Sequence, residues 1–125
     1  MYREVVEQML CDYENGKFSY YGQIAKRIGW DDRARTVDRY FIEIDEFFKN
    51  HLQPPFTSIL VKKEDGIPGD GYFKEHYPHI YKEAEKKTDE EKDLFLIEFW
   101  WKTLDKFDIE KAKGLADMFF RQNEM

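Results

Sequence analysis

The chain of 125 residues has a single cysteine and only three histidines. One cysteine, Cys11, excludes an internal disulfide and any CxxC metal or redox site. We expect Cys11 to be buried in a helix, as free cysteines usually are. The histidines do not form an HExxH pattern, and the partial triad His76, His79 and Glu83 is a combination that often arises by chance. We therefore expect neither a metal nor another cofactor.

Long apolar runs are also missing. No stretch approaches the roughly 18 apolar residues of a membrane-spanning helix, so we expect no membrane partner. Residues 1–7 mix acids with apolar side chains and lack a small-residue cleavage site, which is typical of neither a signal peptide nor a transit peptide. These absences predict a cytoplasmic protein. The 42% hydrophobic and 18% aromatic content is enough for the core of one domain.

Positive charge is scarce and unevenly distributed. The chain has 26 acidic and 20 basic residues, a net charge of -6. Residues 17–39 contain six bases and three acids, a local charge of +3, whereas residues 76–125 contain nine bases and twelve acids, a charge of -3. Affinity for a nucleic-acid backbone comes from clustered Lys and Arg. Only the N-terminal basic segment therefore favours nucleic-acid binding.

Apolar residues at helical spacing predict three helices in the first half of the chain. The first covers residues 2–14 and is ended by Asn15-Gly16. A second, short helix has Ser19 as its N-cap and Gly29 after its end. A third begins at Asp31-Asp32. Its apolar stripe consists of Val37, Tyr40, Phe41, Ile44, Phe47 and Phe48.

A short β element is expected next. Pro54-Pro55 ends the third helix, and residues 56–63 are rich in the β-branched and apolar side chains of a strand. Residues 64–66 form a turn signal, and the glycine-rich residues 67–71 predict a wing that leads to a second strand at Tyr72-Phe73. Two helices followed by a hairpin predict a winged helix-turn-helix.

Helical patterns return after the hairpin. Pro78 allows a helix start, a capping box begins at Thr88, and Asp108 caps a last helix. We therefore predict a mainly α fold with a small β-hairpin. A winged helix-turn-helix core occupies residues 1–75 and a C-terminal helical extension occupies residues 76–125, both within a single domain.

Several segments of the core resemble a known family. They are Tyr21-Gly22-Gln23-Ile24-Ala25, Ala34-Arg35-Thr36-Val37, Pro55 before Ile59-Leu60-Val61, and Gly66 before Gly69 to Tyr72. Over about residues 19–73 the chain resembles the DNA-binding domain of the O6-alkylguanine-DNA alkyltransferase and alkyltransferase-like family. The resemblance implies that Tyr21 pushes on the nucleotide backbone and that Arg35 fills the space left by a flipped base. The glycine-rich segment is also similar to small bacterial and phage proteins of this winged type.

The active centre of that family is not matched. Pro55-Phe56-Thr57-Ser58 stands where the family has Pro-Cys-His-Arg or Pro-Trp-His-Arg. Without a thiolate at this point the chain has no acceptor for an alkyl group. Asp38 replaces the glycine of the family's ARAVG-like helix, and its carboxylate would repel phosphate. No nucleophile and base stand at a suitable spacing elsewhere, so we expect no enzymatic activity.

Two functions stay open. The first is non-enzymatic binding of duplex DNA, with the predicted contact residues Tyr21, Gln23, Arg33, Arg35, Arg39, Lys62 and Lys63. Alternatively, these arginines pair with neighbouring acids on a solvated face. The second function is a protein-interaction factor or inhibitor that directs its acidic surface and aromatic C-terminal helices against a nucleic-acid enzyme. Residues 94–101 are apolar nearly all round. We expect the core to cover them; the alternative is that a face is left for a protein partner or a homodimer.

Overall fold

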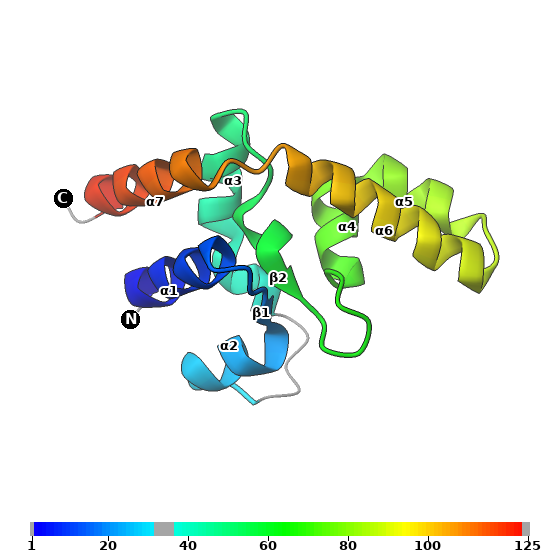
Figure 1. Cartoon of the computed structure of the whole chain (residues 1–125), viewed down its shortest axis with the longest axis horizontal. Coiled ribbons are helices and arrows are strands. Elements are labelled where there is room, and N and C mark those ends of the chain that lie inside the picture. Colours follow the sequence, from blue (N-terminus) through cyan, green and yellow to red (C-terminus); the bar gives the residue numbers. More distant parts are fainter. Residues whose placement is uncertain (1, 32–36, 124–125) are drawn as a thin grey trace.

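The computed structural model describes residues 2–31 and 37–123. These residues form seven α-helices, two 3-10 helices (η1 and η2) and two short strands (Figure 1). The expected mainly α fold with a small β element is confirmed. No helix in the described ranges has the length and apolar character needed to cross a membrane.

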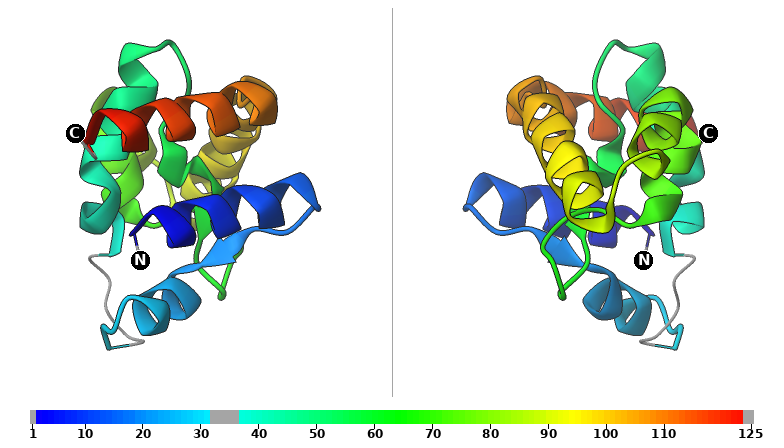
Figure 2. Two further views of the ribbon diagram at one scale, coloured as in Figure 1. Left: turned by 90° about the vertical axis from the view of Figure 1, so that its left-hand side faces the viewer. Right: turned by 90° about the vertical axis from the view of Figure 1, so that its right-hand side faces the viewer.

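The helices gather in two groups on either side of the strands (Figures 1 and 2). One group contains α1 (Tyr2–Glu14), α3 (Ile42–Asn50) and α7 (Ile109–Asn123). The other contains α4 (Asp70–His76), α5 (Pro78–Glu85) and α6 (Asp89–Asp105). The last helix, α7, thus packs against the first, and the C-terminal segment contributes to both groups.

The predicted hairpin and wing are wrong. The strands of the described sheet, β1 (Ser19–Tyr20) and β2 (Leu60–Val61), are parallel, with Ser19 opposite Leu60 and Tyr20 opposite Val61. The first half of the predicted first strand is the 3-10 helix η2 (Phe56–Ile59), and Tyr72-Phe73 lies inside α4. The cause is burial: Tyr72 and Phe73 are both buried, and the helix brings the Tyr72 hydroxyl within 2.6 Å of the Ser58 hydroxyl.

The predicted C-terminal ends of the first two helices are confirmed, whereas Ser19, the predicted N-cap of the second helix, lies in β1 and Tyr20 is the N-cap. Gly16 and Gly29 follow α1 and α2 (Tyr21–Arg27) and both have a positive φ of 81°. Glycine adopts this left-handed conformation without a steric penalty. The predicted third helix is divided into η1 (Val37–Phe41) and α3. Of its expected beginning, Asp31 is not in a helix and Asp32 lies outside the described residues.

Helix starts in the second half follow the sequence signals. Pro78 is the first residue of α5, and the Thr88 side chain accepts the amide hydrogen of Glu91 at the start of α6. The Asp108 carboxylate accepts two backbone amide hydrogens at the start of α7. The burial predicted for Cys11 is wrong, because its position on α1 is exposed.

Aromatic side chains fill the core between the two groups of helices. Phe41, Phe56, Tyr72 and Trp100 are each at most 2% exposed. They come from η1, η2, α4 and α6. The core is therefore continuous across both groups and includes one face of α6.

Replacement of Leu52 by glycine should stabilise the protein. Leu52 follows α3 with a φ of 63°, its amide donates to the Lys49 carbonyl, and the Gln53 amide donates to the Phe48 carbonyl. This is the helix-ending motif that prefers glycine, and the leucine side chain is 92% exposed, so little packing would be lost. We expect Leu52→Gly to raise the free energy of unfolding by about 1 kcal/mol in a urea titration.

Leu52→Ala is the matched control because it shortens the side chain and keeps the left-handed strain. It should leave the free energy of unfolding within about 0.5 kcal/mol of the wild type. Equal effects of glycine and alanine at this position would show that backbone strain is not the cause.

Candidate functional site

Tyr21 begins α2, but its hydroxyl is bonded within the protein. The hydroxyl donates to Oδ1 of Asp38 at 2.9 Å and accepts the amide hydrogen of Gly69 at 3.0 Å. Burial first, and the Asp38 carboxylate second, raise the pKa of Tyr21 well above 10. Tyr21 therefore ties η1 to the loop that precedes α4.

The other predicted DNA-contact residues that the structure describes come from three different segments. Gln23 is exposed on α2, where its side-chain oxygen accepts the amide hydrogen of Tyr20. Lys62 forms an ion pair with Asp65 at 2.8 Å. Among the described basic residues of this set, Arg39 and Lys63 are exposed and form no ion pair with a described residue. The predicted contacts Arg33 and Arg35 lie outside the described residues.

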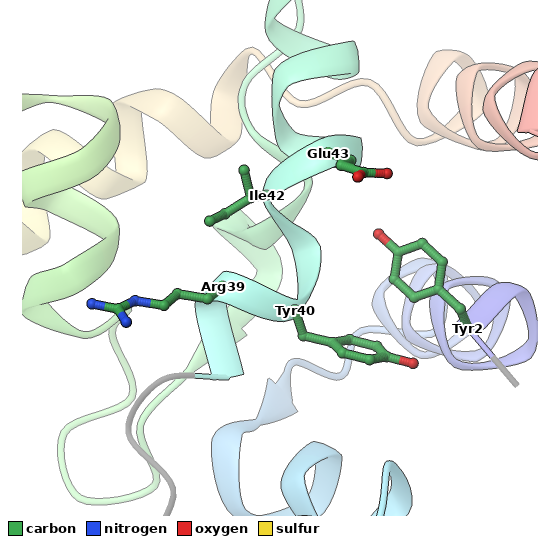
Figure 3. A pocket seen from close by; sticks show the side chains of 5 residues that line it. All are labelled: Tyr2, Arg39, Tyr40, Ile42 and Glu43. Carbon is green, nitrogen blue, oxygen red and sulfur yellow. The ribbon is translucent and has the colours of Figure 1, made fainter.

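A pocket of about 500 Å³ lies where η1 meets α3. Its lining side chains are Tyr2, Arg39, Tyr40, Ile42 and Glu43 (Figure 3). Figure 3 shows the side chains of Arg39 and Ile42 on one side of the helical segment and those of Tyr2, Tyr40 and Glu43 on the other. The polar groups therefore do not converge on one point, which a specific small-molecule site requires.

A buried polar cluster joins the two groups of helices. The Asp45 carboxylate on α3 accepts hydrogen bonds from the amide and the hydroxyl of Thr57, both at 2.8 Å. It also lies 3.1 Å from Nε2 of His76 on α4, and the side chains of Asp45 and His76 are 1% and 4% exposed. Lys49 Nζ lies 3.4 Å from Nδ1 of His76. Because an ammonium group has no lone pair, Nδ1 accepts from Lys49 and Nε2 donates to Asp45.

A second set of buried hydrogen bonds continues from this cluster to α6. The hydroxyls of Ser58 and Tyr72 are 2.6 Å apart, and the indole nitrogen of Trp100 donates to the Ser58 carbonyl at 2.8 Å. Every buried side-chain nitrogen and oxygen in the described part of the chain has a partner. Each polar group of this junction is therefore satisfied within the fold, and we assign the junction a structural role.

Two carboxyl groups, those of the partly buried Asp38 and the buried Asp45, have pKa values above their ordinary value. Burial raises the pKa of Asp38 from 3.8 to about 6, although the hydrogen bond from Tyr21 opposes the shift. Burial also raises the pKa of Asp45, against the opposing effect of the hydrogen bond from His76. Both shifts have a structural cause, so they do not identify a catalytic acid.

The partial triad of His76, His79 and Glu83 is not assembled. His76 contacts Asp45, whereas Glu83 pairs with Lys86 on the surface at 3.2 Å. Within residues 2–31 and 37–123, no three histidine, cysteine or acidic side chains are grouped to hold a metal ion. Sequence spacing missed the true partner because Asp45 and His76 are 31 residues apart.

The outer face of α6 carries unburied apolar side chains. Leu94 is 63% exposed and Trp101 is 54% exposed, while Leu96 and Trp100, which point away from them around the helix, are buried. At 100° per residue, Leu94 and Trp101 lie within about 20° of each other around the helix. Four exposed acids lie within about 60° of Leu94 around the helix, on the same face. They are Glu90, Glu91, Glu98 and Asp105.

We call these six residues the α6 outer face. None of its four acids forms an ion pair with a described residue. The sequence signal for this face was the segment 94–101, which is apolar nearly all round its helix. The choice between core and partner depended on how much of the circumference of α6 the fold covers. Phe95, Ile97 and Phe99 are partly buried against the core, whereas Leu94 and Trp101 stay exposed.

Comparison with known proteins adds no family assignment. Searches of protein-family models, curated proteins and solved structures find no match to the chain. The candidate functions therefore have to be weighed on the side chains alone. The described bases among the predicted DNA contacts come from two segments, Arg39 from η1 and Lys62 and Lys63 from the residues after β2, whereas the α6 outer face gathers apolar and acidic groups on one helix.

Proposed function

We propose that this protein is a protein-interaction factor and that the α6 outer face is its binding surface. The observation that carries the proposal is the exposure of Leu94 and Trp101, two turns apart on the same face of α6, while Leu96 and Trp100 of this helix are buried in the core. Exposed large apolar side chains that cluster with a polar rim are typical of protein-binding sites. Tryptophan is also the residue most enriched among those that dominate binding energy.

The rigid support of the face favours the proposal. Trp100, next to Trp101, is buried and hydrogen-bonded to Ser58, and it fixes the rotation of α6 about its axis. The side chains of the outer face are therefore presented in one orientation before a partner arrives. A preformed surface reduces the entropy lost on binding.

Capture of partners from the native host tests this proposal. The variant Leu94→Ser with Trp101→Ser should lose the specifically captured protein, because removal of two central apolar contacts costs roughly 2 kcal/mol or more of binding free energy. The double variant should keep the wild-type free energy of unfolding within about 1 kcal/mol, since both side chains are exposed.

The matched control is Leu52→Ser with Met118→Ser, which removes two exposed apolar side chains from other surfaces. This control should capture the same protein as the wild type. If the α6 double variant captures as much of the partner protein as this control does, a binding role for α6 is contradicted.

Binding of duplex DNA is the second candidate, and the exposure of Arg39 and Lys63 favours it. It predicts binding at low salt in a fluorescence anisotropy titration, with a loss when Arg33, Arg35 and Arg39 are replaced by alanine. If the protein binds no duplex DNA, or if those replacements change nothing, this candidate fails. The protein-interaction proposal does not depend on that result.

A further inference from the structure

We propose that the partner segment that docks on the α6 outer face is a cationic amphipathic helix of another protein. This inference rests on the proposed function and adds the chemistry of the partner. Its basis is the pattern of charge around the two exposed apolar side chains. A ligand for this face must cover the apolar pair and must also meet four carboxylates.

The charge of α6 is strongly one-sided. The helix contains six acids and two lysines, a net charge of -4, within a chain of -6. One of the lysines, Lys92, lies against the ring of Tyr81 with its Nζ 4.9 Å from the centroid. The other, Lys102, is exposed at the edge of the outer face. The acids of the face are therefore largely uncompensated within α6.

The spacing of the apolar pair fits a helix as the partner. Leu94 and Trp101 are seven residues apart, which is two turns and about 10.5 Å along the axis. A partner helix that repeats apolar residues every three to four positions can contact both along one stripe. Lysines and arginines that flank this stripe would lie opposite Glu91 and Glu98.

Charge excludes other occupants of the face. A second copy docked by the same face would bring its four acids against these four acids, and like charges at an interface oppose association. Duplex DNA and an anionic lipid surface would meet the same repulsion. A cationic segment is the class of ligand for which both the apolar pair and its acidic rim are favourable.

A fluorescein-labelled, lysine-rich amphipathic helical peptide tests the inference by anisotropy titration of the full chain. We expect saturable binding that weakens by about tenfold or more when salt is raised from roughly 0.05 to 0.5 M. Trp101→Ser should weaken binding by about tenfold or more. Glu98→Lys should weaken it by about fivefold, whereas Glu64→Lys, the same charge change at an exposed loop position, should have a much smaller effect.

Two further peptides separate the sources of binding. A shuffled peptide of equal composition should bind at least about tenfold more weakly than the amphipathic peptide, because it lacks the apolar stripe. A version with glutamate in place of lysine should not bind. Equal binding of the shuffled peptide, or a Trp101→Ser variant that binds as well as the wild type, would overturn the inference.

The result also separates the inference from the function on which it rests. If host capture depends on Leu94 and Trp101 but the cationic peptide does not bind, the α6 outer face stays a protein-binding surface and the cationic partner is rejected. If host capture does not depend on these residues, the proposed function itself fails, and peptide binding that is insensitive to Trp101→Ser would reject the inference as well.

Discussion

Asp45→Ala is expected to lower the free energy of unfolding by about 3–5 kcal/mol, which approaches the whole stability of a small domain. The carboxylate accepts hydrogen bonds from the amide and hydroxyl of Thr57 and from His76. Alanine leaves these donors buried without an acceptor, and a cavity remains where the carboxylate was. Urea denaturation at pH 7, followed by tryptophan fluorescence, measures the loss.

Two variants control this experiment. Asp45→Asn retains one acceptor but directs an amide NH₂ at donors of Thr57 and His76, so it should cost about 2 kcal/mol. Glu46→Ala removes the carboxylate of the next residue of α3, which is exposed and lies 3.5 Å from Nζ of Lys49. This variant should change the free energy of unfolding by less than about 1 kcal/mol. A loss below about 1 kcal/mol for Asp45→Ala would show that the junction does not stabilise the fold.

Asp38 is expected to lower the free energy of unfolding by about 2–3 kcal/mol as the pH rises, and Asp38→Asn is expected to remove this pH dependence. The pKa of Asp38 rises from 3.8 to about 6 on folding, chiefly because the carboxyl group is buried. The folded state therefore binds the proton more tightly than the unfolded state does. This stabilisation is fully present below pH 3.8 and is lost as the pH rises through about 6.

Urea titrations at intervals between pH 4 and pH 8 measure the effect as a difference between wild type and variant. The variant should gain stability relative to the wild type over this range, because asparagine stays neutral and its side-chain oxygen can still accept the hydrogen bond from Tyr21. Glu64→Gln, at an exposed loop position, is the control and should follow the wild-type curve. If the free energies of unfolding of Asp38→Asn and the wild type change in parallel with pH, the raised pKa of Asp38 is contradicted.

The DNA-binding hypothesis shows where a local motif is insufficient. The segment that begins at Tyr21 resembles a family in which this tyrosine acts on the nucleotide backbone. In the fold its hydroxyl donates a hydrogen bond to Asp38 and accepts one from the Gly69 amide. The sequence could not indicate this arrangement, because Gly69 is 48 residues from Tyr21.

The α6 outer face could be predicted only in part. The run from Leu94 to Trp101 showed that a helix with apolar side chains on all sides would form. Which of these side chains are buried depends on the rotation of α6 about its axis. That rotation is fixed by contacts such as the hydrogen bond from Trp100 to Ser58, 42 residues away. Helical periodicity states which residues share a face but not which face meets the core.

The local features could be predicted from the amino-acid pattern: the positions of most helices, their ends at Gly16 and Gly29, and the capping residues Thr88 and Asp108. These depend on backbone preferences and on hydrogen bonds between residues a few positions apart. The fold was needed to establish that β1 and β2 are parallel, that Tyr72 belongs to a helix, and that Asp45 contacts His76. Such pairings join distant segments, and they are selected by burial and by the need to satisfy buried polar groups, neither of which a short stretch of sequence specifies.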